Sequence, residues 1–266
     1  MSPPVRGLVV QGVGPTLVLV HGTAGGRSSF GTLPWYLRDR LRVAGYDRRG
    51  TGAWSIGDDE AAPPVETHAR DLEDVVRSTG DAPVVVFGTS FGATVALEML
   101  RARTPRVAGA ILHEPAILET AGIDAESSPV AREFLRLSAA GREREAVERF
   151  LARLDPQAAG NPATKDGRAR GRGGAPEWRA VHRDLAAAVA WRPRLDEFVA
   201  IDMPVLLLES ERSAPARRAS VESLARILPG ARRESIAGAS HVLSGDETWR
   251  RVAAIVAPFV AWCVGA

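Results

Sequence analysis

The chain of 266 residues has almost no lysine and almost no cysteine. Lys165 is the only lysine and Cys263 is the only cysteine, so an internal disulfide is excluded and a cysteine-based metal site has too few thiols. Arginine carries the positive charge, but acidic residues nearly cancel it and leave a formal net charge of +2. Because the arginines are scattered beside acidic residues and form no stripe with aromatics, the sequence favours no nucleic-acid partner.

Long apolar runs are missing as well. No stretch approaches the roughly 20 apolar residues that a membrane-spanning helix needs, and the first ten residues lack the charged leader and apolar run of a signal peptide. We therefore expect a cytoplasmic protein that uses no membrane partner and is a monomer or a homodimer. With 45% hydrophobic residues, the chain can bury one substantial core, which predicts one main domain with an insertion.

Short apolar runs alternate with helical patterns from residue 17 onward, which is typical of βαβ units on a parallel sheet. Strands are expected at residues 17–20, 41–46, 84–87, 107–112, 204–209 and 232–236, and helices at 66–79, 93–103, 216–228 and 247–262. Between about 116 and 200 this rhythm gives way to helical segments. The sequence predicts an α/β fold: a mostly parallel twisted sheet flanked by helices over 1–115 and 201–266, with an inserted helical lid over 116–200.

The segment Gly88-Thr89-Ser90-Phe91-Gly92 lies directly between a predicted strand and a predicted helix. In that context G-x-S-x-G forms a sharp, strained turn that exposes the serine hydroxyl, and the following helix places its positive end near the reacting atoms. Ser90 is therefore the predicted nucleophile.

The predicted base is His241, which follows the last predicted strand and precedes the last predicted helix. A serine hydroxyl is a poor nucleophile near neutral pH and needs an imidazole to take its proton. We expect His21 to hold its own loop by hydrogen bonds, without a role in proton transfer. His68 and His182 lie in helical patterns with charged neighbours, so both are expected at the surface.

The run His21-Gly22-Thr23-Ala24-Gly25-Gly26 follows the first buried strand, where a flexible loop can present a backbone N–H group to a substrate carbonyl. The predicted oxyanion-hole donors are the backbone N–H groups of Thr23 and Phe91. The sequence signals no metal and no organic cofactor.

Four motifs agree in order and spacing with a known superfamily: H-G at 21–22, D-R-R-G-T-G at 47–52, G-T-S-F-G at 88–92 and G-A-S-H at 238–241. The chain resembles the serine-nucleophile branch of the α/β-hydrolase superfamily over nearly its whole length, apart from the lid. This resemblance implies that Asp47 and Arg48 are structural residues that tie loops together.

The resemblance is broken at the acid of the triad. Family members usually carry an Asp a few residues past the strand that follows the lid, but in the matching stretch, 210–215, a serine occupies that position. Some members, haloalkane dehalogenases among them, take the acid from the end of the strand after the nucleophile helix. Glu114 stands there in H-E-P and is the predicted acid, with Glu211 and Glu209 left open as alternatives.

Serine at position 90 disfavours epoxide hydrolase and haloalkane dehalogenase chemistry. The family members that catalyse those reactions resemble this chain but use Asp as the nucleophile at that turn. The sequence predicts a serine hydrolase that cleaves an ester, lactone or thioester of a small molecule through an acyl-enzyme on Ser90. The alternatives are acyl transfer, C–C bond cleavage, perhydrolysis or cyclisation at the same site, and a non-catalytic small-molecule receptor. Trp178 and Trp191 are expected to anchor the lid helices, with lining of an apolar pocket as the alternative.

Overall fold

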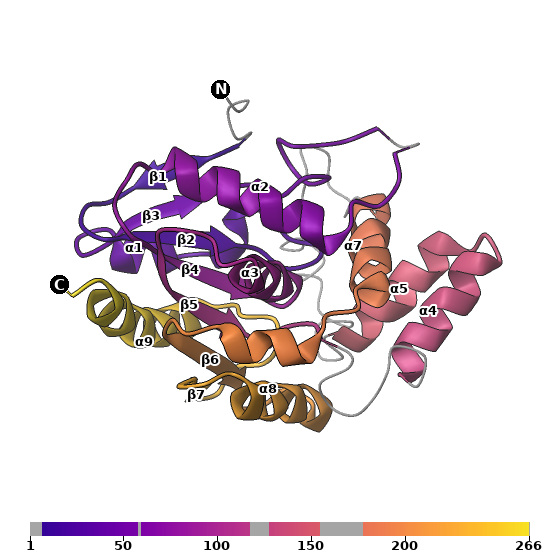
Figure 1. Cartoon of the computed structure of the whole chain (residues 1–266). Coiled ribbons are helices and arrows are strands. Elements are labelled where there is room, and N and C mark those ends of the chain that lie inside the picture. Colours follow the sequence, from indigo (N-terminus) through magenta and orange to yellow (C-terminus); the bar gives the residue numbers. More distant parts are fainter. Residues whose placement is uncertain (1–6, 58–59, 118–127, 155–177, 266) are drawn as a thin grey trace.

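The computed structural model describes residues 7–57, 60–117, 128–154 and 178–265. In these residues the strands form one seven-stranded sheet with the order β1-β3-β2-β4-β5-β6-β7 (Figure 1). The short strand β1 (Val9–Gln11) pairs antiparallel with β3 (Arg42–Gly45), and every other neighbouring pair is parallel. The predicted α/β fold with a mostly parallel sheet is confirmed.

The middle of the sheet is built from continuous apolar runs, because a parallel strand covered by helices on both faces has no solvent side. These strands are β2 (Thr16–Val20), β4 (Val84–Thr89), β5 (Val107–His113) and β6 (Val205–Ser210). By contrast, the edge strand β7 (Arg232–Ile236) exposes its first four residues. Because both faces are buried, the central strands are held firmly, and so are the residues that follow their carboxyl ends.

Helices cover both faces of the sheet (Figure 1). One apolar cluster joins the sheet to α2 (Val65–Ser78), α3 (Phe91–Arg101) and α8 (Pro215–Ile227). A second cluster, on the other face, contains residues of η1 (Arg27–Phe30), α1 (Leu33–Leu37) and α9 (Asp246–Val264). Among the described residues, no helix has both the length and the apolar character that crossing a bilayer requires.

Among the described residues, three α-helices lie between β5 and β6 in the chain, and we call them the inserted helices: α4 (Pro129–Ala139), α5 (Glu143–Leu154) and α7 (Trp178–Ala190). They stand to the right of the sheet in Figure 1 and share their own apolar cluster, which includes Phe134, Leu137 and Leu185. After them, η3 (Leu195–Ala200) returns the chain to β6. The lid boundaries at 116 and 200 stay a prediction.

The two tryptophans of this region differ. Trp191 follows α7 and belongs to the main apolar core together with Phe198, and its indole N–H donates to Glu98 on α3 over 3.2 Å. Trp191 thus anchors the end of α7 to the helix that follows Ser90, as the sequence led us to expect. Trp178, at the other end of α7, packs against the cluster of the inserted helices.

Candidate active site

Ser90 is the turn residue between β4 and α3. Its φ of 52° lies in the left-handed region, which a residue with a side chain rarely adopts. Glycine is required on both sides of it: a Cβ built on Gly92 would lie 2.2 Å from the Val20 carbonyl oxygen, and one on Gly88 would lie 2.5 Å from the carbonyl oxygen of Gly92. The G-x-S-x-G pattern therefore allows β4 and α3 to approach closely enough to hold Ser90 in this strained conformation.

His241 lies in the loop between β7 and α9, and its side chain faces Ser90. Its Nε2 is 3.2 Å from Ser90 Oγ, and its Nδ1 is 2.6 Å from Glu114 Oε2. The three side chains come from three different loops and form one continuous chain of hydrogen bonds. The structure therefore brings together the nucleophile, base and acid that the sequence predicts.

Glu114 follows β5 directly and has a φ of 42°. Its Oε1 accepts the Ser210 backbone N–H over 2.8 Å, while Oε2 accepts from the Ser213 hydroxyl over 2.8 Å and from His241 over 2.6 Å. Burial alone would raise its pKa, but the hydrogen bond from His241, the nearby charges of His113 and His241 and the Ser210 N–H together lower it to about 2. Glu114 is therefore a carboxylate at neutral pH, so Nδ1 of His241 carries the shared proton.

The other two candidate acids have different partners. Glu209 pairs with Arg233 over 3.2 Å on the neighbouring edge strand. Glu211 accepts the backbone N–H of Gly238 over 2.6 Å. Among the described contacts, Glu114 is the carboxylate that reaches His241.

The sheet itself sets the distance between nucleophile and acid. In the pairing of β4 with β5, Thr89 is opposite His113, so Ser90 and Glu114 are the next residues on two adjacent strands. The Ser90 N–H donates to the His113 carbonyl over 2.8 Å, and the Glu114 N–H donates to the Leu208 carbonyl on β6 over 3.1 Å. Both residues are thus held by backbone hydrogen bonds of the sheet.

Three residues that surround the acid were not predicted from the sequence: His113, Ser210 and Ser213. His113 is fully buried, its Nε2 lies 2.9 Å from Ser210 Oγ, and its ring stacks 6.0 Å from that of His241. Burial lowers the pKa of His113 to about 4, although Glu114 opposes the shift, so His113 is neutral at pH 7. The only signal for these residues was their presence in H-E-P and in the serine-bearing stretch that replaces the usual Asp.

Both segments that carry a predicted oxyanion donor lie beside Ser90. Phe91 is the first residue of α3, so its N–H has no carbonyl one turn earlier to bond. Thr23 lies in a turn in which the Gly25 N–H donates to the Gly22 carbonyl over 3.3 Å. This loop is close to the nucleophile, since a Cβ built on Gly22 would lie 3.1 Å from Ser90 Cβ.

His21 is completely buried and does hold its loop. Its Nδ1 donates to the Gly22 carbonyl over 2.9 Å, and its Nε2 accepts the Arg48 backbone N–H over 3.1 Å. The expected surface position of His68 is wrong, because the residue is only 2% exposed and its ring meets Phe91 edge-on. The reason is helix geometry: three residues after Val65, His68 falls on the face of α2 that packs against α3. His182 is half-buried, with Nε2 3.0 Å from Ser138 Oγ.

Asp47 ties two loops to each other. Its carboxylate accepts the Arg27 backbone N–H over 2.9 Å, the Arg27 guanidinium over 2.9 Å and the Ala53 N–H over 3.0 Å. Arg48 turns the other way, toward His21 and α7. These contacts agree with the structural role that the resemblance implies.

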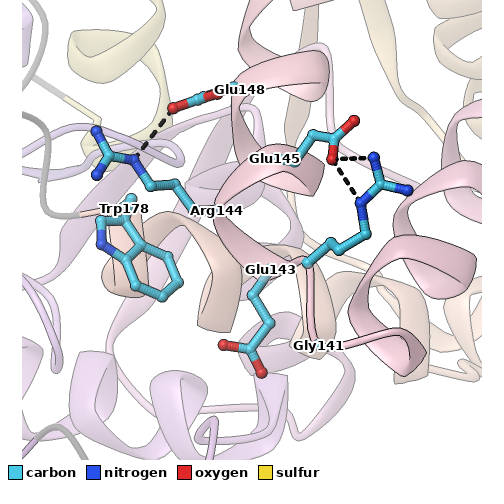
Figure 2. Close-up of a pocket in the computed structure, with 7 residues that line it drawn as sticks. Gly141, Glu143, Arg144, Glu145, Glu148 and Trp178 are labelled. Carbon is cyan, nitrogen blue, oxygen red and sulfur yellow. Dashed lines mark hydrogen bonds and ion pairs between the residues drawn. The ribbon is translucent and has the colours of Figure 1, made fainter.

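A separate hollow of about 490 Å³ lies among the inserted helices (Figure 2). Trp178 forms part of its wall, beside the ion pair of Arg144 with Glu148, in which Nε and Oε1 are 3.1 Å apart. None of Ser90, His241 and Glu114 lines this hollow. Within the described part of the chain, no group of three or more His, Cys, Asp or Glu side chains is arranged to hold a metal ion.

Comparison with known proteins gives one consistent result. The profile of the Alpha/beta hydrolase family matches residues 17–255. The "Uncharacterized hydrolase YraK" of Bacillus subtilis (strain 168) is 33% identical over 110 residues, which are 41% of this chain and 41% of that relative. The match therefore spans about two fifths of the relative's length.

Solved structures resemble the whole chain in fold. A thermophilic esterase from Thermogutta terrifontis is 23% identical with a TM-score of 0.78, over 97% of this chain and 93% of that one. The esterase RhEst1 from Rhodococcus sp. ECU1013 is 21% identical with a TM-score of 0.71, over 96% and 94%. At this level of identity the likeness establishes the architecture.

Proposed function

This chain belongs to the alpha/beta hydrolase family, and we propose that it is a serine hydrolase that cleaves an ester, lactone or thioester of a small molecule. The observation that carries the proposal is the hydrogen-bonded chain from Ser90 through His241 to Glu114, with distances of 3.2 and 2.6 Å. This arrangement supplies an activated nucleophile and a base in the correct tautomer.

In the proposed reaction His241 Nε2 takes the proton of Ser90 Oγ as the oxygen attacks the acyl carbon. The carbonyl oxygen becomes an oxyanion, which the backbone N–H groups of Thr23 and Phe91 stabilise. The imidazolium then gives its proton to the leaving group, the bond to that group breaks, and the acyl group remains on Ser90. Water, deprotonated by the same Nε2, releases the acid and restores the serine.

Glu114 stabilises the imidazolium that forms in each half of the cycle. Its pKa of about 2 keeps it ionised at neutral pH. In serine triads, replacing the acid by its amide lowers kcat by about 10⁴-fold, because the imidazole is then held in the wrong tautomer. We expect a loss of about 10³- to 10⁴-fold for Glu114→Gln.

The test combines active-site labelling with turnover. Wild-type protein, Ser90→Ala, Glu114→Gln and Glu209→Gln are treated with a fluorophosphonate and assayed on p-nitrophenyl esters of short- and medium-chain acids. Glu209 is the matched control, since it lies at the end of a neighbouring strand but pairs with Arg233. Labelling and turnover should be lost in Ser90→Ala, and turnover should fall in Glu114→Gln but not in Glu209→Gln.

Two results would count against the proposal. Ester turnover by Ser90→Ala at the wild-type rate would remove the serine from the mechanism. A wild type that neither reacts with the fluorophosphonate nor turns over any ester would favour the receptor hypothesis, whereas labelling without ester turnover would favour acyl transfer or cyclisation.

A further inference from the structure

The turn that bears Thr23 is held in place by the guanidinium of Arg48. Arg48 Nε donates to the His21 carbonyl over 2.9 Å, and Nη2 donates to the Gly22 carbonyl over 3.2 Å. The Gly22 carbonyl and the Thr23 N–H belong to one planar trans peptide, so they point in opposite directions. Arg48, together with His21 Nδ1 and the Gly25 N–H, holds this carbonyl and with it the direction of the Thr23 N–H.

Arg48 contacts the second oxyanion residue as well. Its guanidinium carbon lies 4.8 Å from the centre of the Phe91 ring. One side chain therefore touches both segments whose N–H groups are the predicted oxyanion donors. It approaches them from within the protein, since the Arg48 side chain is only 1% exposed.

The partner that balances this buried charge comes from the inserted helices. Asp184 on α7 accepts from Arg48 Nη1 over 3.0 Å and from Nη2 over 2.6 Å, and its side chain is 4% exposed. A bidentate pair fixes the plane of the guanidinium as well as its position. The orientation of Arg48 against the turn thus depends on where α7 is docked.

A second contact links the same turn to the inserted helices. Ala24, next to Thr23, packs against the apolar cluster formed by α4, α5 and α7. Its φ of 60° is unusual for a residue with a side chain. The turn is thus contacted both by Arg48 and by this cluster.

We propose that Asp184 is a positioning residue that acts through Arg48, so that the oxyanion site is formed only when α7 is docked on the core. This inference rests on the proposed acyl-transfer function of Ser90. It assigns to the inserted helices a part in aligning the reacting groups.

The most direct test removes both charges together. In the double variant Arg48→Met with Asp184→Leu, no buried charge is left unpaired, and apolar replacement of buried ion pairs is commonly neutral or stabilising. We expect the thermal midpoint to stay close to that of the wild type while kcat falls by about 10- to 100-fold, since loss of one oxyanion donor costs about 10²- to 10³-fold. KM should change by less than about threefold, because the substrate carbonyl is bound weakly before charge develops.

An inhibitor separates alignment from folding. A trifluoromethyl ketone adds to the serine and carries an oxyanion, so its affinity should fall in proportion to kcat. The matched control is Trp191→Phe, which removes only the hydrogen bond from the end of α7 to Glu98; the ring that remains can still pack in the core, so α7 stays docked and Arg48 is untouched. This control should lower the thermal midpoint and leave kcat and inhibitor affinity within about twofold of the wild type.

The results of these experiments separate a failure of the positioning role from a failure of the proposed hydrolase function. If the double variant is folded and keeps wild-type kcat and inhibitor affinity while Ser90 still reacts with a fluorophosphonate, the positioning role is overturned and the hydrolase proposal stands. If the wild type itself shows neither labelling nor turnover, the proposed function fails and the inference fails with it.

Discussion

Moving the proposed triad acid to the neighbouring loop should partly restore the activity of a variant that lacks Glu114. The Ser213 hydroxyl lies 2.8 Å from Glu114 Oε2, the oxygen that also contacts His241 Nδ1 over 2.6 Å. In Ser213→Asp the carboxyl carbon takes the place of the hydroxyl oxygen, and its oxygens extend about 1.2 Å further. A carboxylate at 213 can therefore come close to the position that Oε2 occupies now.

The background for this experiment is Glu114→Gly. Glycine removes the carboxylate and tolerates the φ of 42° that residue 114 adopts. Alone, it should lower kcat/KM by about 10⁴-fold, equivalent to about 5.4 kcal/mol of transition-state stabilisation. Adding Ser213→Asp should recover about 10- to 100-fold, since an acid at that position is present but imperfectly aligned.

The assay is kcat/KM on the best ester substrate, with circular dichroism to show that each variant is folded. Ser213→Asp in the presence of Glu114 serves as the opposite control: two carboxylates at one place repel each other, so this variant should be less active than the wild type. A folded double variant no better than Glu114→Gly would refute the geometric reasoning. Wild-type activity in Glu114→Gly would refute the assignment of the acid itself.

Two further predictions concern stability. Gly92→Ala should destabilise the fold by about 3 kcal/mol or more, because its Cβ would lie 2.2 Å from the Val20 carbonyl oxygen, and the backbone there cannot move aside. Thermal unfolding checks this against Gly57→Ala, where the atom nearest to the added Cβ is 3.4 Å away. Equal thermal midpoints of the two variants would contradict the prediction. The second prediction follows from the pKa of Glu114, which falls from 4.5 to about 2 on folding. Because the folded state favours the ionised carboxylate, Glu114 stabilises the protein above about pH 4.5, and this stabilisation is lost as the pH falls toward 2. Urea unfolding between pH 6 and 3 should therefore show a steeper loss for the wild type than for Glu114→Gln, and a difference independent of pH would contradict the linkage.

The parts of the fold that sequence predicts well are those decided by local pattern. The apolar run before Ser90 predicts β4, because a strand buried on both faces is a nearly continuous run of apolar residues. The glycines on either side of Ser90 predict the turn, because no larger residue fits at those positions. The strand Val9–Gln11 was not predicted, since it is three residues long, exposed and paired only at an edge.

The parts that could not be predicted depend on which loops meet in space. Glu114 was proposed from its place after a strand, and the alternative Glu211 is equally close to a strand end. Nothing in one sequence shows that Ser210 and Ser213 turn their hydrogen-bond donors toward Glu114. The burial of His68 was missed for the same reason, because it depends on which face of α2 meets α3.

The pairing of β4 with β5 has a consequence for local unfolding near the active site. Proteins open in cooperative units, and adjacent central strands belong to the unit that opens last. Since Ser90 and Glu114 extend from such neighbouring strands, we expect fluctuations of the sheet edge near β7 to displace His241 while the other two residues stay in register. Hydrogen exchange at the amides of Ser90 and Glu114 should then be slow. Movements of the His241 side chain alone would set how often the hydrogen-bonded chain from Ser90 to Glu114 is interrupted.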